Sequence, residues 1–390
     1  MTSLSVGGRG RIGGIALALL GVALVPGSAA AGLKTGFADP IFASGDDGTR
    51  ATWLENARKA RAEIVRIDVS WRAVAPGEEP ADPANAASYA WGALPAAVAD
   101  ADSRGLKVLL TVSSAPAWAE GPNRPPNVLP GTWMPAADKF GQFARAVAAR
   151  FGPAGVRHYQ AWNEPNIYTF LNPQYEGKRL VAPTHYRRML NAFYAGVHEV
   201  QPGAVVVSGG TAPYGGARGT ERTRPLAFLR KLLCLKGRKR LKPVACDPKP
   251  KLDALAHHPI NTSGGPHRSA LHPDDAATPD VKHVVRTLRE AERRKRVATG
   301  GRHPVWVTEF WWETKPPDTC TGVPAKRQGQ WIGEALRSFR RQGAAAAINF
   351  LIRDQPYQQS DCGRATFQSG AFFADGTRKP AFKAFRRFGP

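Results

Sequence analysis

The sequence has few cysteines, an excess of basic over acidic residues, and no long apolar run in its interior. Only 4 of its 390 residues are cysteine, and none form a C-x-x-C pair, which argues against a structural zinc site. After the first thirty residues no stretch reaches the roughly 20 apolar residues that a membrane-spanning helix needs. No glycine-rich phosphate turn follows the first predicted strand, so a dinucleotide-binding fold is disfavoured. We therefore expect no metal and no cofactor.

Acidic residues are scarce relative to basic ones, 31 against 54, for a net charge of +23. The basic residues are dense in 231–251 and 286–302. We favour the interpretation that these residues form a solvated basic surface. A more specific interpretation is that they attract an anionic polymer such as a cell-wall polysaccharide. Nucleic acid fits less well, because the basic runs lack interleaved aromatic residues.

The first 31 residues differ from the rest of the chain. Arg9 and Arg11 precede an apolar run over 12–25, and small residues ending in Ala31 follow. This order predicts a signal peptide over 1–31 and hence a secreted protein. A membrane anchor is the alternative, but the run is short and interrupted by glycines.

The four cysteines are Cys234, Cys246, Cys320 and Cys362. An even number in an exported chain predicts two disulfides, for which three pairings are possible. Cys234–Cys246 would close a short basic loop, and Cys320–Cys362 would connect two late loops.

From residue 32 onward, short apolar strands alternate with helical stretches. The predicted strands are 33–37, 64–68, 106–112, 156–162, 204–208, 252–257, 305–309 and 345–350. The predicted helices are about 49–62, from 94, 136–151, 184–200, 225–235, 279–296, 325–341 and one opening near 376–382. Eight such units predict an α/β protein, a (β/α)8 TIM barrel forming a single domain over 32–390 with long βα loops. An open, doubly wound sheet is the alternative.

Two glutamates stand where predicted strands end, the usual place for reactive groups in such a barrel. Glu164 follows the fourth strand in Trp162-Asn163-Glu164-Pro165-Asn166, and Glu309 ends the seventh, just before Phe310. A pair of carboxyl groups can cleave a glycosidic bond, one protonating the leaving oxygen while the other attacks the anomeric carbon. A salt bridge or helix cap would explain one such glutamate, but aromatic residues flank both.

These motifs resemble those of clan A of the glycoside hydrolases, which includes the cellulase-like family 5 and the xylosidase-like family 39. The resemblance spans nearly the whole chain after residue 31. It implies that Glu164 is the acid/base, that Glu309 is the nucleophile, and that Asn163 donates to a sugar hydroxyl.

The same resemblance extends to Arg66 in the second strand and His257 in the sixth. Arg66 would support the nucleophile, unless it only forms a buried ion pair with Asp68. A metal site at His257 and His258 is disfavoured, because adjacent strand residues point to opposite faces. The tyrosine that the clan places shortly after this histidine is missing, and the eighth strand ends in Phe350 instead of tryptophan.

Aromatic residues in the loops are candidates for stacking on sugar rings, although each could equally be loop core: Tyr168, Trp118, Trp311, Trp312 and Tyr357. Of these, we predict that Tyr168 and Trp311 bind substrate, together with Asn163, Arg66 and His257. Glu313 is a rival nucleophile but lies beyond the strand end. Asp253 begins the sixth strand and is expected to be structural.

The sequence therefore predicts a secreted retaining glycoside hydrolase acting on a poly- or oligosaccharide. A non-catalytic carbohydrate-binding barrel and a transglycosylase using the same residues are the alternatives.

Overall fold

The computed structural model describes residues 7, 32–217, 219–261, 264–358, 362 and 365–389. Residues Gly32–Pro390 form one compact unit. Apart from Gly7, the predicted signal peptide lies outside the described residues. Within the described part of the chain, no helix has the length and apolarity needed to cross a bilayer.

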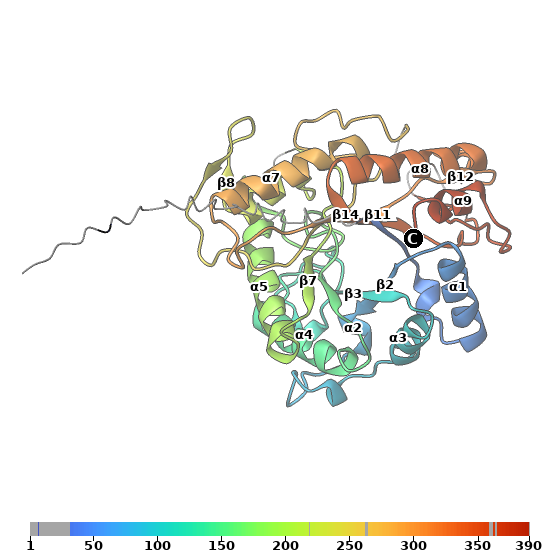
Figure 1. Ribbon diagram of the computed structural model, residues 1–390. Helices are drawn as coiled ribbons and strands as arrows, with labels where there is room; N and C mark the ends of the chain where they lie inside the picture. Colours follow the sequence, from blue (N-terminus) through green and yellow to red (C-terminus); the bar gives the residue numbers. More distant parts are fainter. Residues whose placement is uncertain are drawn as a thin grey trace, which may run out of the picture. The chain divides into compact units, whose positions relative to one another are not determined.

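Eight parallel strands form the centre of the compact unit (Figure 1). They are β1 (Lys34–Ala38), β2 (Ile64–Ser70), β3 (Lys107–Ser113), β4 (His158–Ala161), β7 (Val205–Ser208), β10 (Leu255–His257), β11 (Val305–Phe310) and β14 (Ala344–Phe350). Their order is β10-β11-β14-β1-β2-β3-β4-β7, and parallel bridges Val207–Ala254 and Thr211–His257 close the ring between β7 and β10. The predicted (β/α)8 barrel is confirmed.

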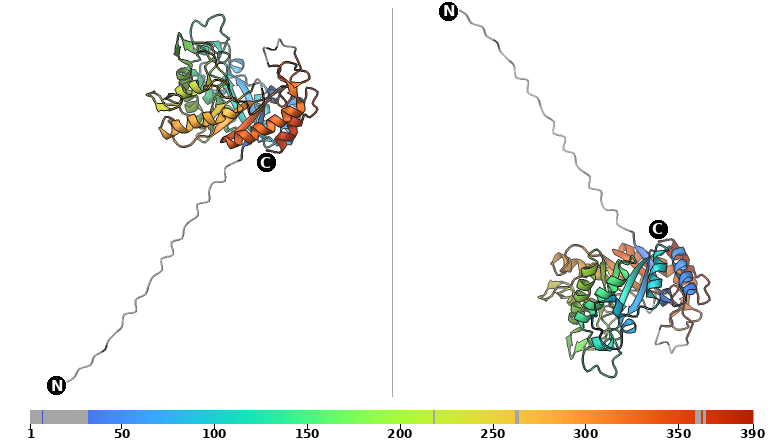
Figure 2. Two further views of the ribbon diagram at one scale, coloured as in Figure 1. Left: turned by 90° about the horizontal axis from the view of Figure 1, so that it is seen from above. Right: turned by 90° about the horizontal axis from the view of Figure 1, so that it is seen from below.

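Helices cover the outside of this barrel (Figures 1 and 2). They are α1 (Asp47–Lys59), α2 (Trp71–Val74), α3 (Leu94–Asp102), α4 (Ala137–Phe151), α5 (Ala182–Val200), α6 (Pro225–Leu232), α7 (Val281–Arg293), α8 (Ala325–Arg341) and α9 (Pro380–Arg386). The closely packed pair α4 and α5 depends on two glycines. A Cβ on Gly196 would lie 2.1 Å from the carbonyl oxygen of Gly141, so only glycine permits this approach.

The period-2 alternation of the strands separates two hydrophobic clusters. Small and medium residues such as Ala256 and Ile348 fill the barrel interior. Large rings such as Trp71 and Phe143, stacked at 5.1 Å, fill the layer between the barrel and its helices. The interior is therefore a packed core and not a pore.

Three small hairpin or bridge pairs lie in the loops: β5 (Tyr175–Glu176) with β6 (Arg179–Leu180), β8 (Leu235–Lys236) with β9 (Lys242–Pro243), and β12 (Thr314–Lys315) with β13 (Val323–Pro324). Cys234 pairs with Cys246, with Cα atoms 5.8 Å apart, beside the β8–β9 hairpin. Cys320 pairs with Cys362, with Cα atoms 5.2 Å apart, and connects the loops after β11 and β14. These are the two pairings considered from the sequence.

Candidate active site

Glu164 is held by a tightly fixed turn after β4. Trp162 and Glu164 both have positive φ, 74° and 34°, which costs on the order of 1–3 kcal/mol for each non-glycine residue. The surroundings hold this conformation. Trp162 is fully buried and its Nε1 donates to the carbonyl of Phe170 (2.8 Å). Asn166 bonds the carbonyls of Ala212 and Thr223 and accepts from the backbone of Ala212.

Glu309 reaches the barrel mouth through an irregularity in β11. Trp306 packs in the barrel interior, so strict alternation would place Thr308 inside and Glu309 outside. The register of β11 against β14 shifts between Val307 and Phe310. Such a bulge changes the direction in which the following side chains point, and bulges are frequent beside active sites. It allows Thr308 and Glu309 both to contact groups at the mouth.

Arg66 is the fixed cation of the site. It is buried, and its Nη1 donates to Glu309 Oε2 (3.1 Å) while its Nε donates to Asp68 Oδ1 (3.0 Å). Its Nη2 donates to Asn163 Oδ1 (3.1 Å). Because a guanidinium can only donate, the atom of Asn163 that faces it must be the carbonyl oxygen. The Nδ2 group of Asn163 is thereby left as the side chain's donor.

The histidine beside the two glutamates is His258 and not His257. His258 Nδ1 lies 3.0 Å from Glu164 Oε1 and 3.9 Å from Glu309 Oε2. His257 lies between Thr211 Oγ1 (2.8 Å) and the carbonyl of Ala276 (2.9 Å), on the outer side of β10. The expectation for His257 is therefore corrected to His258. The alternation contained the signal, because Ala254 and Ala256 face the barrel interior and His258 is next in that series.

A chain of polar contacts below the mouth assigns the tautomer of His258. Thr111 Oγ1 donates to Gln160 Oε1 (3.2 Å), and Gln160 Nε2 donates to Thr308 Oγ1 (3.3 Å). The hydroxyl hydrogen of Thr308 is then directed to His258 Nε2, 3.0 Å away. Nε2 accepts, so Nδ1 carries the hydrogen and donates it to Glu164 Oε1. Burial lowers the pKa of His258 to about 4, so the ring is neutral near pH 7.

The two carboxyl groups face each other across His258. The summed distances to its Nδ1 bound the separation of Glu164 Oε1 and Glu309 Oε2 at 6.9 Å. Their side chains are 13% and 14% exposed, so both remain accessible from the mouth. We call Arg66, Glu164, His258 and Glu309 the mouth cluster.

The environments of the two glutamates differ in charge. Burial raises the pKa of Glu164 to about 7, opposed by the more distant charges of Arg66 and Arg222. Burial also raises the pKa of Glu309, but the charge of the directly bonded Arg66 opposes that shift. Because only Glu309 accepts a hydrogen bond from the guanidinium, we assign the first ionisation of this coupled pair to Glu309.

The remaining sequence candidates lie in loops that follow β3, β4 and β11, in different environments. Tyr168 is 39% exposed on the loop that follows Glu164. Trp311 is partly buried, and its Nε1 has no hydrogen-bond partner among the described residues. Trp312 is buried, and its Nε1 donates to the carbonyl of Gly264. Trp118 Nε1 donates to the carbonyl of Pro76.

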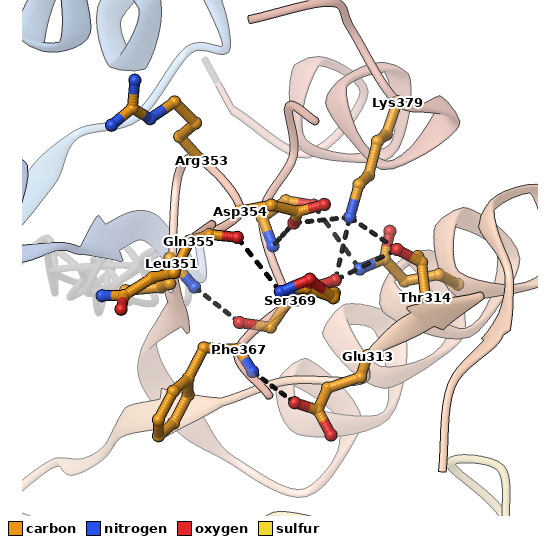
Figure 3. A network of polar contacts seen from close by, with 12 residues as sticks. Glu313, Thr314, Leu351, Arg353, Asp354, Gln355, Phe367, Ser369 and Lys379 are labelled. Atoms are coloured by element: carbon orange, nitrogen blue, oxygen red, sulfur yellow. Dashed lines mark hydrogen bonds and ion pairs between the residues drawn. The ribbon is translucent and has the colours of Figure 1, made fainter. Parts of the chain in front are cut away.

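Glu313, the rival nucleophile, belongs to a separate polar network, which we call the anchor cluster: Glu313, Thr314, Asp354, Gln368 and Lys379 (Figure 3). Glu313 is 3% exposed, and its Oε1 accepts from the backbone amides of Thr366 and Phe367 (2.5 Å each). Its Oε2 accepts from Thr321 Oγ1 (2.9 Å). With all these acceptor positions occupied, Glu313 holds loops together.

Asp253, expected to be structural, likewise bonds within the protein. Its Oδ2 accepts from the backbone of Val206 (2.8 Å) and lies 2.9 Å from His198 Nε2. Among the described residues, no group of three or more His, Cys, Asp or Glu side chains is placed to hold a metal ion.

Comparison with known proteins gives matches by structure only. No protein-family profile and no curated protein sequence matches the chain. A family 39 glycoside hydrolase from the gut symbiont Bacteroides cellulosilyticus WH2 superposes with a TM-score of 0.63 at 18% identity. GH5_18 from Streptomyces cattleya, in complex with GlcNAc, gives 0.57 at 17%, and the Ignisphaera aggregans GH53 catalytic domain 0.56 at 15%. This chain has the fold of the clan A glycoside hydrolases.

The lengths of these proteins differ. The family 39 match covers 92% of this chain but 64% of the longer enzyme. The GH5_18 and GH53 matches cover 92% and 94% of this chain, and 80% and 98% of those chains. The clan A fold therefore accounts for nearly all of the compact unit.

Proposed function

We propose that this clan A protein is a retaining glycoside hydrolase in which Glu309 is the nucleophile and Glu164 the acid/base. The observation that carries this proposal is the asymmetry of the mouth cluster. Two accessible carboxyl groups face one another, and Arg66 is hydrogen-bonded to only one of them. A non-catalytic sugar-binding barrel would need neither the facing pair nor this unequal charge.

In the first step Glu309 attacks the anomeric carbon. Its Oε2 is held by Arg66, which leaves Oε1 as the attacking oxygen. Glu164, with a pKa of about 7, can carry a proton near neutral pH. Because His258 donates to Oε1 of Glu164, that proton sits on Oε2, from which it passes to the leaving oxygen. The glycosyl–Glu309 ester forms as the glycosidic bond breaks.

In the second step water releases the sugar from Glu309. The glycosyl ester neutralises the charge of Glu309, and Glu164, now ionised, removes a proton from the incoming water. The Nδ1–H of His258 stabilises the ionised Glu164 during this step. The Nδ2 group of Asn163 is the donor available for a sugar hydroxyl.

The distance bound is compatible with retention. Retaining pairs have carboxyl groups about 5–5.5 Å apart, whereas inverting pairs need about 6.5–9.5 Å to admit a water. The 6.9 Å limit on Glu164 Oε1 and Glu309 Oε2 includes the first range, and the configuration of the product in the following test decides between the two.

The test is turnover of a panel of aryl glycosides followed by rescue of a nucleophile variant. The panel includes β-glucosides, β-mannosides and N-acetylglucosaminides, since structural neighbours are a glucosidase and GH5_18 enzymes in complex with GlcNAc or Manb1-4GlcNAc. Glu309→Gly should be inactive, and azide should restore turnover with a glycosyl azide of inverted configuration. Rescue with retained configuration would contradict the assignment of Glu309. Unchanged turnover in both Glu309→Ala and Glu164→Ala would refute glycosidase chemistry at this site.

We also propose that residues 1–31 export the protein and are removed. Two disulfides support an oxidising compartment. Amino-terminal sequencing of protein recovered from the culture medium should give a start at residue 31 or 32; recovery only from the cell interior with Met1 intact would contradict export.

A further inference from the structure

A second charged region lies along α7, away from the mouth cluster. Two adjoining cavities of about 540 and 330 Å³ share Lys239, Leu241 and Arg286 in their walls. None of the residues lining them belongs to the mouth cluster. We call the pair of cavities the α7 groove.

Cations dominate the lining of the α7 groove. The cations are Arg230, Arg238, Lys239, Arg240, Lys282, Arg286, Arg293 and Arg294, against the acids Asp275, Asp280 and Glu290. Lys239, Arg240 and Lys282 are exposed, and none has a side-chain hydrogen bond or ion pair to another described residue.

The acids of the groove are already neutralised or bonded within the protein. Asp275 pairs with Arg224, and Asp280 accepts from the backbone amides of Ala270 and Ala277. Glu290 is shared by Arg293 and Arg294. Arg230 and Arg238 in turn pair with Asp274. The net positive charge that remains in the groove comes from Lys239, Arg240, Lys282 and Arg286.

The cations of α7 are spaced along one side of the helix. Lys282, Arg286 and Arg293 stand at positions i, i+4 and i+11, which fall on one face and extend over about 16 Å. The β8–β9 hairpin adds Lys239, whose carbonyl accepts from Arg286 (2.8 Å). A row of this length suits several negative charges of an extended polymer better than a single small anion.

We propose that the α7 groove binds a carboxylated polysaccharide and tethers the enzyme to it. Guanidinium groups bind carboxylates through paired, charge-assisted hydrogen bonds. No Phe, Tyr or Trp lines either cavity, so binding there depends on charge and not on stacking with a base or a sugar ring, which disfavours single-stranded nucleic acids. The choice of a polysaccharide as the partner rests on the proposed glycosidase function.

The test compares binding of full-length enzyme to polygalacturonate and to fully methyl-esterified pectin, the same backbone with its carboxylates neutralised. We expect binding to polygalacturonate alone, falling steeply with added salt. Lys239→Ala, Lys282→Ala and Arg286→Ala combined should weaken binding at least about tenfold and flatten its salt dependence. A control variant removes the same charge from exposed positions on α8 and α9: Lys326→Ala, Arg337→Ala and Lys383→Ala.

The control variant should bind like the wild type. Equal weakening in both triple variants would mean that net charge, not the groove, attracts the polymer. Wild-type affinity in the groove variant would likewise overturn the proposal. Equal or tighter binding of duplex DNA through the same three residues would overturn the choice of partner.

Turnover of a small aryl glycoside separates this proposal from the first one. The groove variant should hydrolyse it like the wild type. A wild-type protein without any turnover would refute the proposed function while leaving polymer binding by the groove to stand.

Discussion

The mouth cluster and the anchor cluster both consist of carboxyl groups and a cation near the carboxyl ends of barrel strands, yet their bonding differs. Lys379 donates to three acceptors, Thr314 Oγ1, Asp354 Oδ1 and the carbonyl of Gln368, at 2.6–2.8 Å (Figure 3). Its side chain is 0% exposed and that of Asp354 3%. In the mouth cluster, Glu164 Oε2 and Glu309 Oε1 accept no hydrogen bond from another described residue.

Under the proposed function, this difference separates a structural carboxylate from a reactive one. In the anchor cluster most donors meet an acceptor, so the buried charges stabilise the packing of the loops after β11 and β14. Burial raises the carboxyl pKa in both clusters, at Glu164 and Glu309 and also at Asp354. The clusters differ in access: the side chains of Glu164 and Glu309 are 13% and 14% exposed, whereas Glu313 and Asp354 are 3% exposed. Accessible carboxyl groups with raised pKa values are what the proposed chemistry needs.

Substitution of Glu309 and of Glu313, which lie four positions apart, should give the largest difference between the two clusters. Glu309→Gln should lower kcat by at least about 10⁴-fold, because it removes the nucleophile while leaving the fold intact. Glu313→Ala should lower the thermal midpoint, because it leaves the amides of Thr366 and Phe367 unbonded, while the pH limbs of kcat/KM stay in place. Kinetics and thermal unfolding measured on both variants check this. The reverse pattern would make Glu313 the reactive group.

Lys379→Met should be the most destabilising change in the anchor cluster. It leaves Asp354 buried without its cation, which costs about 3–5 kcal/mol of unfolding free energy. Denaturant unfolding measures this loss. The matched double variant Lys379→Met with Asp354→Leu should recover a large part of it, because no unpaired charge remains. A loss below about 1 kcal/mol in the single variant would contradict a structural role for the pair.

Glu164→Gln should stabilise the protein at alkaline pH. With a pKa of about 7 against 4.5 in the unfolded chain, folded Glu164 holds a proton that the unfolded chain releases between these values. Wild-type stability therefore falls as the pH rises through this window. Removing the carboxyl should raise the unfolding free energy by roughly 2–3 kcal/mol near pH 8 and by little near pH 4. Thermal midpoints of both proteins at the two pH values test this, and a pH-independent difference would contradict it.

The smallest expected effects distinguish the adjacent histidines. His258→Gln should lower kcat on the order of tenfold and shift the alkaline limb of kcat/KM upward, because the donor to ionised Glu164 is weakened. His257→Gln should change stability through its bonds to Thr211 and Ala276 without moving that limb. If the alkaline limb of kcat/KM stays in place in His258→Gln, or moves in His257→Gln, the assignment of His258 as the donor to Glu164 is contradicted.

Periodicity predicted the barrel well because each element carries its own pattern. All eight predicted barrel strands occur, and the helix predicted over 325–341 coincides with α8. The same alternation also distinguishes the two histidines, although the prediction named His257. His257 is the last residue of β10 and His258 follows it, and the inward series Ala254, Ala256, His258 identifies which of the two lies beside the glutamates. No local pattern showed that Glu313 is hydrogen-bonded within the protein, because its partners Thr366 and Phe367 lie more than fifty positions away.

The sequence by itself determined the scaffold, the two glutamates at strand ends and the arginine in β2, because alternation, strand length and flanking aromatic residues are local properties. Only the tertiary structure decided how those groups share charge. Arg66 meets Asn163 across 97 positions and Glu309 across 243, and His258 meets Glu164 across 94. Closure of the barrel brings these residues within hydrogen-bond distance. Burial there raises the pKa of both glutamates, and the hydrogen bond from Arg66 favours ionisation of Glu309 over Glu164.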